Sequence, residues 1–174
     1  MKTHHVLCVS GSLRAASLNT ALLTLAAACA PPGLHLHLYT GLGQLPLFNP
    51  DLEPKEPAPV VQFQQAIAQA DAVLIASPEY AHGVSSVMKN ALDWSVASGV
   101  FVDKPVVLWN ASPRATIALA ALQETLAVMS ARLVDAAQLE LLIQSPPVGQ
   151  EAHTNPDPAA MRKALLALQT HLRA

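Results

Sequence analysis

Residues 72–83 read AVLIASPEYAHG and contain the two features from which the fold follows. The first five are apolar without alternation, which is typical of a strand buried on both faces of a sheet. The next seven form a polar, turn-rich loop, and residues 84–96 then carry apolar side chains at helical spacing. A buried strand followed by a helix indicates one unit of a parallel sheet covered by helices.

The same alternation runs along the whole chain. Strands are predicted at 6–9, 34–39, 72–76 and 105–109, with a fifth inside 132–142, and helices at 18–29, 60–70, 84–96, 119–129 and 161–172. Residues 34–39 alternate Leu with His, as expected at a sheet edge. Residues 41–59 and 146–158 are proline-rich connections. These units predict one α/β domain over residues 1–174, with a doubly wound, five-stranded parallel sheet of order 2-1-3-4-5 and helices on both faces.

The composition excludes several classes of protein. Only 13% of residues are charged, against roughly 25% in a typical soluble domain. A net charge of -2 leaves no basic footprint for nucleic acid. No apolar run approaches the ~18 residues of a membrane span or forms a signal peptide, so we expect a cytoplasmic protein. Cys8 and Cys29 fit two buried thiols in a reducing compartment better than a disulfide framework or a metal site.

Three polar loops should meet at the carboxyl ends of strands one, three and four, where this sheet order places a ligand crevice: 10–19, 77–83 and 110–114. The first loop opens a helix, whose free N–H groups suit a phosphate. Ser12, Ser17 and Asn19 add short polar donors, and Arg14 adds a forked cation. The alternative is that Ser17 only caps the helix and Arg14 is a solvated side chain.

The second loop offers a platform for a flat heteroaromatic ring. Pro78 and Gly83 should hold a tight path, while Tyr80 offers an aromatic face and His82 two ring nitrogens. Ordinary partial burial of Tyr80 and a surface position for His82 remain open. Glu79 has no acidic or nucleophilic companion, so we expect it to bond nearby backbone or an opposing subunit.

Four segments together form a recognisable set of motifs. Residues 11–19 read G-S-L-R-x-x-S-x-N, and residues 77–83 read S-P-E-Y-x-x-G. Residues 89–94 follow with K-N-A-L-D-W, and 45–48 give a softer match to L-P-L-[FY]. With these motifs the chain resembles the NADPH-dependent FMN reductase family, a branch of flavodoxin-like proteins that includes quinone, azo-dye and chromate reductases. The resemblance covers about residues 6 to 134 and implies a flavodoxin-like fold.

The resemblance implies an oxidoreductase in which FMN carries the chemistry and no protein group or metal is catalytic. NADPH or NADH would donate electrons, and a quinone or flavin would accept them at the same face in a ping-pong cycle. Residues 89–94 would lie on the helix through which a homodimer or homotetramer forms. The low charge fraction and the large apolar Trp94 favour the same assembly, although Trp94 could also be simply a core residue. The candidate cofactor-binding residues are Ser10, Ser12, Arg14, Ser17, Leu18, Asn19, Pro78, Glu79, Tyr80, Ala81, His82, Gly83, Ser112 and Arg114.

Within that set, the family pattern assigns the FMN phosphate to the first loop and the ribityl chain and ring to the second. Several positions depart from the pattern. Ala81 stands where Asn is usual, and the third loop, residues 111–116, reads ASPRAT where relatives are glycine-rich, which leaves less room for a ring. Arg114 is a candidate for the NADPH phosphate or the flavin edge, and equally for a surface charge at a helix start.

Two other functions compete with this reading. A flavin-binding electron carrier or sensor would usually be strongly acidic, which a net charge of -2 disfavours. A hydrolase would need a nucleophile elbow, and no G-x-S-x-G motif is present.

Overall fold

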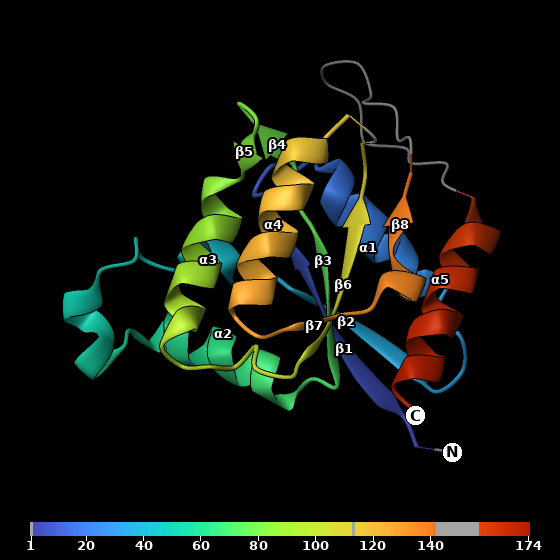
Figure 1. The fold of residues 1–174 in the computed structure, drawn as a ribbon, viewed down its shortest axis with the longest axis horizontal. Coiled ribbons are helices and arrows are strands. Elements are labelled where there is room, and N and C mark those ends of the chain that lie inside the picture. Colours follow the sequence, from blue (N-terminus) through green and yellow to red (C-terminus); the bar gives the residue numbers. More distant parts are fainter. Residues whose placement is uncertain (1, 113, 142–156) are drawn as a thin grey trace.

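Long and short strands together form one parallel sheet at the centre of the molecule (Figure 1). The computed structural model describes residues 2–112, 114–141 and 157–174. The strands of this sheet are β1 (His4–Ser10), β2 (Leu34–Tyr39), β3 (Ala72–Ala76), β6 (Pro105–Asn110), β7 (Arg132–Leu133) and β8 (Leu139–Glu140). They run in the order β2-β1-β3-β6, and both β7 and β8 pair with β6 at the far edge.

This arrangement confirms the predicted order 2-1-3-4-5, with one refinement at the fifth position. The predicted fifth strand is two short pieces, because the 3-10 turn η3 (Asp135–Ala137) interrupts the pairing between β7 and β8. The proline-rich connection at 41–59 is also less irregular than expected, since it contains the 3-10 helices η1 (Leu42–Gln44) and η2 (Pro50–Lys55). Most of the 146–158 connection lies outside the described residues.

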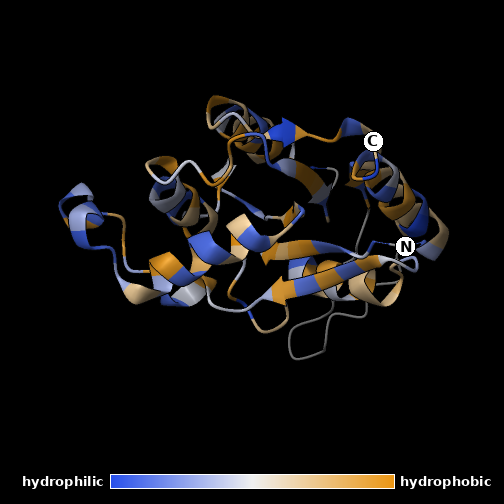
Figure 2. Cartoon of the chain, turned by 90° about the horizontal axis from the view of Figure 1, so that it is seen from below, coloured by the Kyte–Doolittle hydropathy of each residue, from blue (hydrophilic) through white to orange (hydrophobic). Residues whose placement is uncertain are grey.

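In the described part of the chain, five helices cover the two faces of the sheet, which Figure 2 shows from below. They are α1 (Leu18–Ala28), α2 (Ala58–Gln69), α3 (Ser86–Val96), α4 (Thr116–Val128) and α5 (Pro158–His171). Alternate residues of each strand point to opposite faces, so Val6 and Cys8 pack with α1 and α5 while Leu7 and Val9 pack with α2, α3 and α4. Within the described chain, no helix has the length and apolar character needed to cross a bilayer.

The two cores explain why the polar loops gather at one edge. β1, β3 and β6 are almost entirely buried, so their neighbouring positions in the sheet are held on both faces. Ser10 pairs with Ala76 in register, and Ala76 pairs with Trp109. The loops that leave these three strands therefore start side by side.

Candidate functional site

A cavity of about 250 Å³ lies where the three loops converge at the carboxyl ends of β1, β3 and β6. Six of the predicted site residues line it: Leu18, Asn19, Pro78, Glu79, Ser112 and Arg114. Four further lining residues were not among the candidates: Ser77, Asn110, Ala111 and Ala115. The remaining candidates lie in the same loops, outside the lining of this cavity: Ser10, Ser12, Arg14, Ser17, Tyr80, Ala81, His82 and Gly83.

The first loop ends in a capped helix start. Ser17 is the N-cap of α1, because its Oγ accepts a hydrogen bond from the backbone N–H of Thr20 at 3.2 Å. The capping alternative for Ser17 is therefore correct, although its hydroxyl proton is still free to reach a ligand. Ser10 Oγ lies 2.8 Å from Thr20 Oγ1 and supports the loop from inside. Arg14 is exposed and forms no ion pair within the described residues.

Asn19 carries the clearest sign of a ligand in this loop. It lies in the first turn of α1, is only 7% exposed and lines the cavity. Its Oδ1 has no hydrogen-bond partner among the described residues. A buried polar group without a partner costs about 1–3 kcal/mol, so a hydrogen-bond donor that reached Asn19 Oδ1 through the cavity would remove this cost.

The second loop, for which the sequence predicts a tight turn-rich path, is a β-hairpin. Strands β4 (Glu79–Tyr80) and β5 (Gly83–Val84) pair through a two-residue turn. The turn residues Ala81 and His82 have φ angles of 48° and 59°, as the favoured two-residue hairpin turns require. The chain therefore turns at Ala81 and His82, whose φ angles lie in the left-handed region. The expectation that Gly83 would make this turn is wrong. Tyr80 is 58% exposed near the hairpin tip.

Glu79 connects this hairpin to the third loop. Its Oε2 accepts a hydrogen bond from the backbone N–H of Ala118, in the first turn of α4, at 2.9 Å. Its Oε1 lies 3.0 Å from His82 Nδ1. The Ala118 N–H, followed by the contact with His82, holds the pKa of Glu79 below its ordinary value. Glu79 thus bonds nearby backbone, one of the two roles expected for it.

A close contact fixes the first loop against the second. Ser85 Oγ donates a hydrogen bond to the backbone oxygen of Gly11 at 2.6 Å and also caps α3 through the N–H of Met88. A Cβ on Gly11 would lie 2.3 Å from Ser77 Oγ, so only glycine fits there. Ser77 and Ser85 thus shape the site, although neither is among the residues proposed from the sequence. Ser85 and Gly11 are 74 positions apart, so their contact leaves no local pattern in the sequence.

The third loop is organised by Asn110, another residue that the sequence analysis did not single out as a site residue. Its buried side chain accepts from the N–H of Ser112 at 3.0 Å and donates to the oxygen of Ala115 at 3.4 Å. These bonds close the glycine-poor loop into a compact turn beside the cavity. Arg114 is exposed at the cavity wall. Pro113, which belongs to the predicted loop 110–114, lies outside the described residues.

The segment 89–94 makes contacts within the chain through Asn90 and Trp94. Trp94 is 1% exposed, and its Nε1 donates to the oxygen of Pro46 at 2.8 Å. Asn90 accepts from the N–H of Phe48 at 2.8 Å and donates to the same Pro46 oxygen. These two side chains hold the 45–48 segment against α3, so two of the recognised motifs stabilise each other. Trp94 is a core residue and gives no support to subunit pairing.

The sheet order, the covered faces and the cavity at the strand ends define a flavodoxin-like α/β protein with a ligand site. The chain belongs to the NADPH-dependent FMN reductase family, whose model matches residues 4–145.

Two curated relatives and one solved structure illustrate the similarity. The chain is 44% identical over 109 residues to an NADPH:quinone oxidoreductase of Arabidopsis thaliana, a match that covers 59% of this chain and 55% of that protein. It is 39% identical over 110 residues to an NAD(P)H-dependent FMN reductase of Pseudomonas aeruginosa, covering 62% and 59%. The chain thus spans little more than half the length of these relatives.

The structure is also similar to the flavoenzyme NAD(P)H:(acceptor) oxidoreductase FerB of Paracoccus denitrificans. The TM-score is 0.70 and the sequence identity 25%, over 98% of this chain and 92% of that one. The flavodoxin-like fold predicted from the sequence is therefore confirmed over nearly the whole chain.

Proposed function

We propose that this protein is an NAD(P)H-dependent oxidoreductase that binds one FMN and reduces flavins, quinones or similar small acceptors in a ping-pong cycle. The unpaired amide of Asn19, buried in the wall of the cavity at the start of α1, carries this proposal. The family match and the names of the relatives, an FMN reductase and a quinone oxidoreductase, support the same cofactor and the same classes of donor and acceptor.

The donors of the first loop fit a phosphate monoester. The N-terminus of α1 presents backbone N–H groups without intrahelical partners. Ser12 and Ser17 add hydroxyl protons, and the exposed guanidinium of Arg14 adds a forked cation. The Asn19 amide can accept from a ribityl hydroxyl or donate to a phosphate oxygen. These four side chains would hold the phosphate end of FMN.

The second and third loops would hold the ring end. Pro78, Glu79 and Ser112 line the cavity, and Tyr80 is exposed near the hairpin tip beside it. Bound FMN supplies the hydride chemistry, so no protein nucleophile or proton relay is needed. Glu79 keeps the hairpin and α4 at a fixed separation through its bonds to Ala118 and His82. One cavity serves donor and acceptor in turn, which predicts parallel lines in double-reciprocal plots.

Titration of the purified chain with FMN tests the proposal directly. We expect the absorbance and fluorescence of FMN to change on binding, and FMN-loaded protein to oxidise NAD(P)H when a quinone is added. The Arg14→Glu variant should lose the flavin while its circular dichroism stays near wild type. FMN spectra that do not respond to wild-type protein would contradict the cofactor assignment. Flavin binding without turnover would favour an electron carrier.

Arg114 is the residue that we assign to the nicotinamide cofactor. Its guanidinium is exposed at the cavity wall, where it can pair with a cofactor phosphate. Loss of a charge-assisted bond costs about 1.5–3 kcal/mol. Arg114→Ala should therefore raise the KM for NADPH about ten- to a hundredfold and leave FMN affinity largely unchanged. An unchanged KM for NADPH would mean that Arg114 is only a surface charge. Intersecting lines in the double-reciprocal plots would exclude a cavity that donor and acceptor share.

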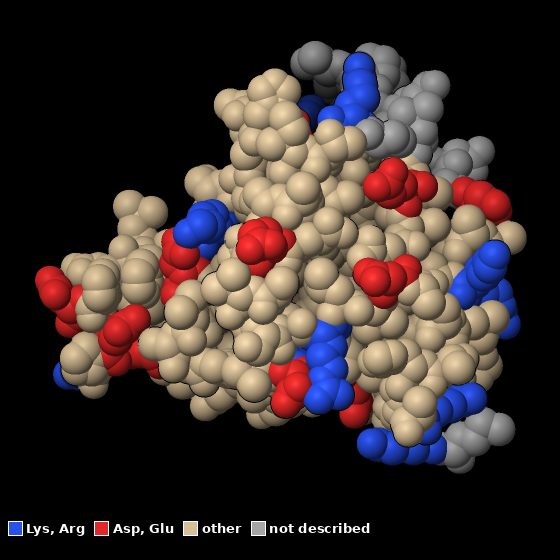
Figure 3. Space-filling view, viewed as in Figure 1, with Lys and Arg blue, Asp and Glu red and all other residues tan. Residues whose placement is uncertain are grey.

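We also propose a homodimer or homotetramer in the cytoplasm. A groove of about 460 Å³ lies between α3, α4 and the 99–102 turn, beside three exposed valines: Val96, Val102 and Val128. Figure 3 shows this face of the molecule as mostly uncharged, with isolated acidic and basic groups. Cys8 and Cys29 are free cysteines, as expected in a reducing compartment.

A further inference from the structure

A second cavity, of about 480 Å³, lies at the outer edge of the sheet beside the C-terminal half of α2. It shares no residue with the candidate cofactor site. Its lining residues are His5, Val6, Leu7, His35, His37, Ala66, Gln69 and Ala70. The ionisable groups of this lining are the three imidazoles, with no Lys, Arg, Asp or Glu among them.

The histidines reach this cavity through strand register. β2 is the edge strand, and its Leu34 and Leu36 are buried while His35 and His37 are exposed. β1 pairs with it in parallel so that His5 lies directly opposite His35. Edge strands are commonly protected by charged side chains, Lys above all. An imidazole offers instead a nitrogen lone pair, which a metal ion can accept.

The His5 and His35 rings have a separation that suits one shared metal ion. Their centroids are 5.5 Å apart, and the ring planes are inclined by 60°. Two imidazoles bound to one tetrahedral ion at ~2.0–2.1 Å per bond would place their centroids about 5 Å apart. The two rings can therefore bind one ion with only a small adjustment of their side-chain torsions.

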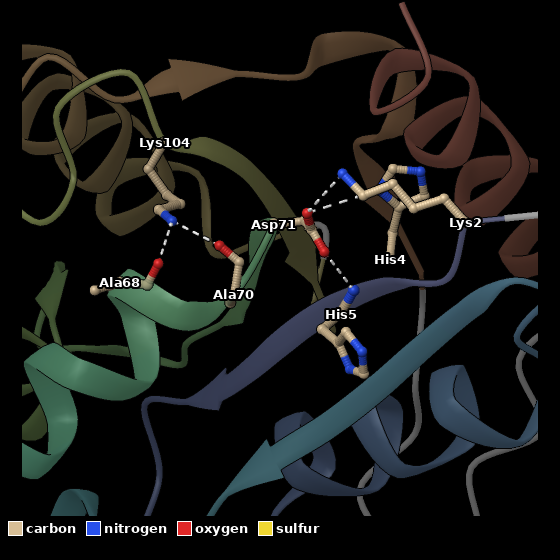
Figure 4. A network of polar contacts seen from close by, with 7 residues as sticks. All are labelled: Lys2, His4, His5, Ala68, Ala70, Asp71 and Lys104. Atoms are coloured by element: carbon tan, nitrogen blue, oxygen red, sulfur yellow. Dashed lines mark hydrogen bonds and ion pairs between the residues drawn. The ribbon is translucent and has the colours of Figure 1, made fainter.

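The backbone at His5 is held in place by Asp71. The N–H of His5 donates to Asp71 Oδ2 at 2.8 Å, and the N–H of Asp71 donates to the oxygen of His5 at 2.8 Å (Figure 4). The same view shows the rings of His4 and His5 on opposite sides of β1, with His5 on the side of β2. The backbone at His5 is thus fixed, while its exposed ring can still turn toward an ion.

We propose that His5 and His35 bind a divalent transition-metal ion such as Zn²⁺, with water at its other positions. Imidazole nitrogen suits Zn²⁺, Ni²⁺ and Cu²⁺, whereas Ca²⁺ and Mg²⁺ prefer oxygen. No three His, Cys, Asp or Glu side chains in the described parts of the chain are gathered to hold a metal. The site therefore has two protein ligands, and His37 is not one of them.

Calorimetric titration of the full-length chain with Zn²⁺ tests the proposal. We expect one ion per chain, and His5→Ala or His35→Ala should each weaken binding about tenfold or more. Two matched controls should keep wild-type affinity. His37→Ala removes an imidazole from the same cavity, and His171→Ala removes an exposed one from the end of α5. Thermal unfolding of each metal-free variant checks that its fold is retained.

A second measurement needs no variant. In NMR spectra of wild-type protein, Zn²⁺ should shift the imidazole signals of His5 and His35 and leave that of His171 in place. The proposal is wrong if wild-type protein binds Zn²⁺ no more tightly than His5→Ala, or if His37→Ala or His171→Ala weakens binding as much as His35→Ala. Neither result bears on flavin binding, because the two cavities have no residue in common.

Discussion

Two asparagines in this chain show how the same side chain acts differently at two positions. The Asn90 amide is fully used, since it bonds both the N–H of Phe48 and the oxygen of Pro46. The Asn19 amide is buried beside the cavity with its Oδ1 unpaired. A satisfied buried amide stabilises the fold, whereas an unsatisfied one lowers stability until a ligand bonds it.

We therefore expect Asn19→Ala and Asn90→Ala to have opposite effects. Asn19→Ala should leave the stability of ligand-free protein unchanged or higher, and should weaken FMN binding by about 1–3 kcal/mol. Asn90→Ala should lower the free energy of unfolding by about the same amount and keep FMN affinity. Urea unfolding and FMN titration of both variants check this. A large loss of ligand-free stability in Asn19→Ala would contradict the assignment.

The hairpin turn also contains a residue with an unfavourable backbone conformation. Ala81 has a φ of 48°, a region in which a Cβ costs about 1–2 kcal/mol. Asn tolerates this conformation better than Ala. Ala81→Asn should therefore raise the free energy of unfolding by up to about 1 kcal/mol, and Ala81→Val should lower it. Urea unfolding that ranks the three proteins in another order would show that the turn relaxes.

At the scale of elements, side chains that cross between loops hold the site together. Glu79 joins the hairpin to α4, Ser85 joins α3 to the first loop, and Asn110 closes the third loop. Each acts between segments that the sheet brings together. The width of the cavity therefore depends on these links as much as on its lining.

The Glu79 link should make stability depend on acid pH. Its folded-state pKa is lowered from the ordinary 4.5, chiefly by the Ala118 N–H. A carboxyl with a lowered folded pKa stabilises the protein above its unfolded pKa, and the contribution is lost as pH falls through the folded value. Wild-type stability should thus fall below pH 4.5 more steeply than that of Glu79→Gln.

Unfolding by urea at a series of pH values measures that difference. Glu53→Gln is a suitable control, because Glu53 is an exposed carboxyl on η2 that lines neither the cofactor cavity nor the α3–α4 groove. It should keep the wild-type profile. Equal profiles for wild type and Glu79→Gln would mean that the bond to Ala118 adds nothing to the free energy of unfolding.

In the molecule as a whole, exposed apolar side chains are distributed unequally between the two helical layers. The α3–α4 side presents Val96, Val102 and Val128, which are 60%, 55% and 75% exposed. On the α1–α5 side, Leu166 is 44% exposed on α5. We take the α3–α4 side as the candidate subunit interface because its exposed valines surround a groove.

Val128→Glu should break the proposed dimer, because a charge buried in an apolar interface without a partner is strongly unfavourable. Leu166→Glu, which places the same charge on α5, should leave the assembly intact. Sedimentation at micromolar concentration distinguishes the two variants. Wild-type protein that sediments as a single chain would contradict the proposed assembly altogether.

The strand order and the positions of the helices were predictable because their signals are local. The apolar run at 72–76 and the Leu–His alternation at 34–39 each identify a strand and its place in the sheet. The meeting of the loops at the carboxyl ends was also predictable, since the parallel order of the strands alone brings 10–19 and 77–83 together. Six of the fourteen proposed site residues line the cavity on this basis.

The tertiary structure alone decided which side chains meet across those loops. Gly11 and Ser85 are 74 positions apart, and Glu79 and Ala118 are 39 apart, so no local pattern could pair them. The sequence left open whether Trp94 favours pairing of subunits or lies in the core, and the structure places it in the core, where the oxygen of Pro46 accepts its N–H. Local sequence determines which elements form, whereas long-range packing determines which polar atoms are bonded and which, as in Asn19, remain free for a ligand.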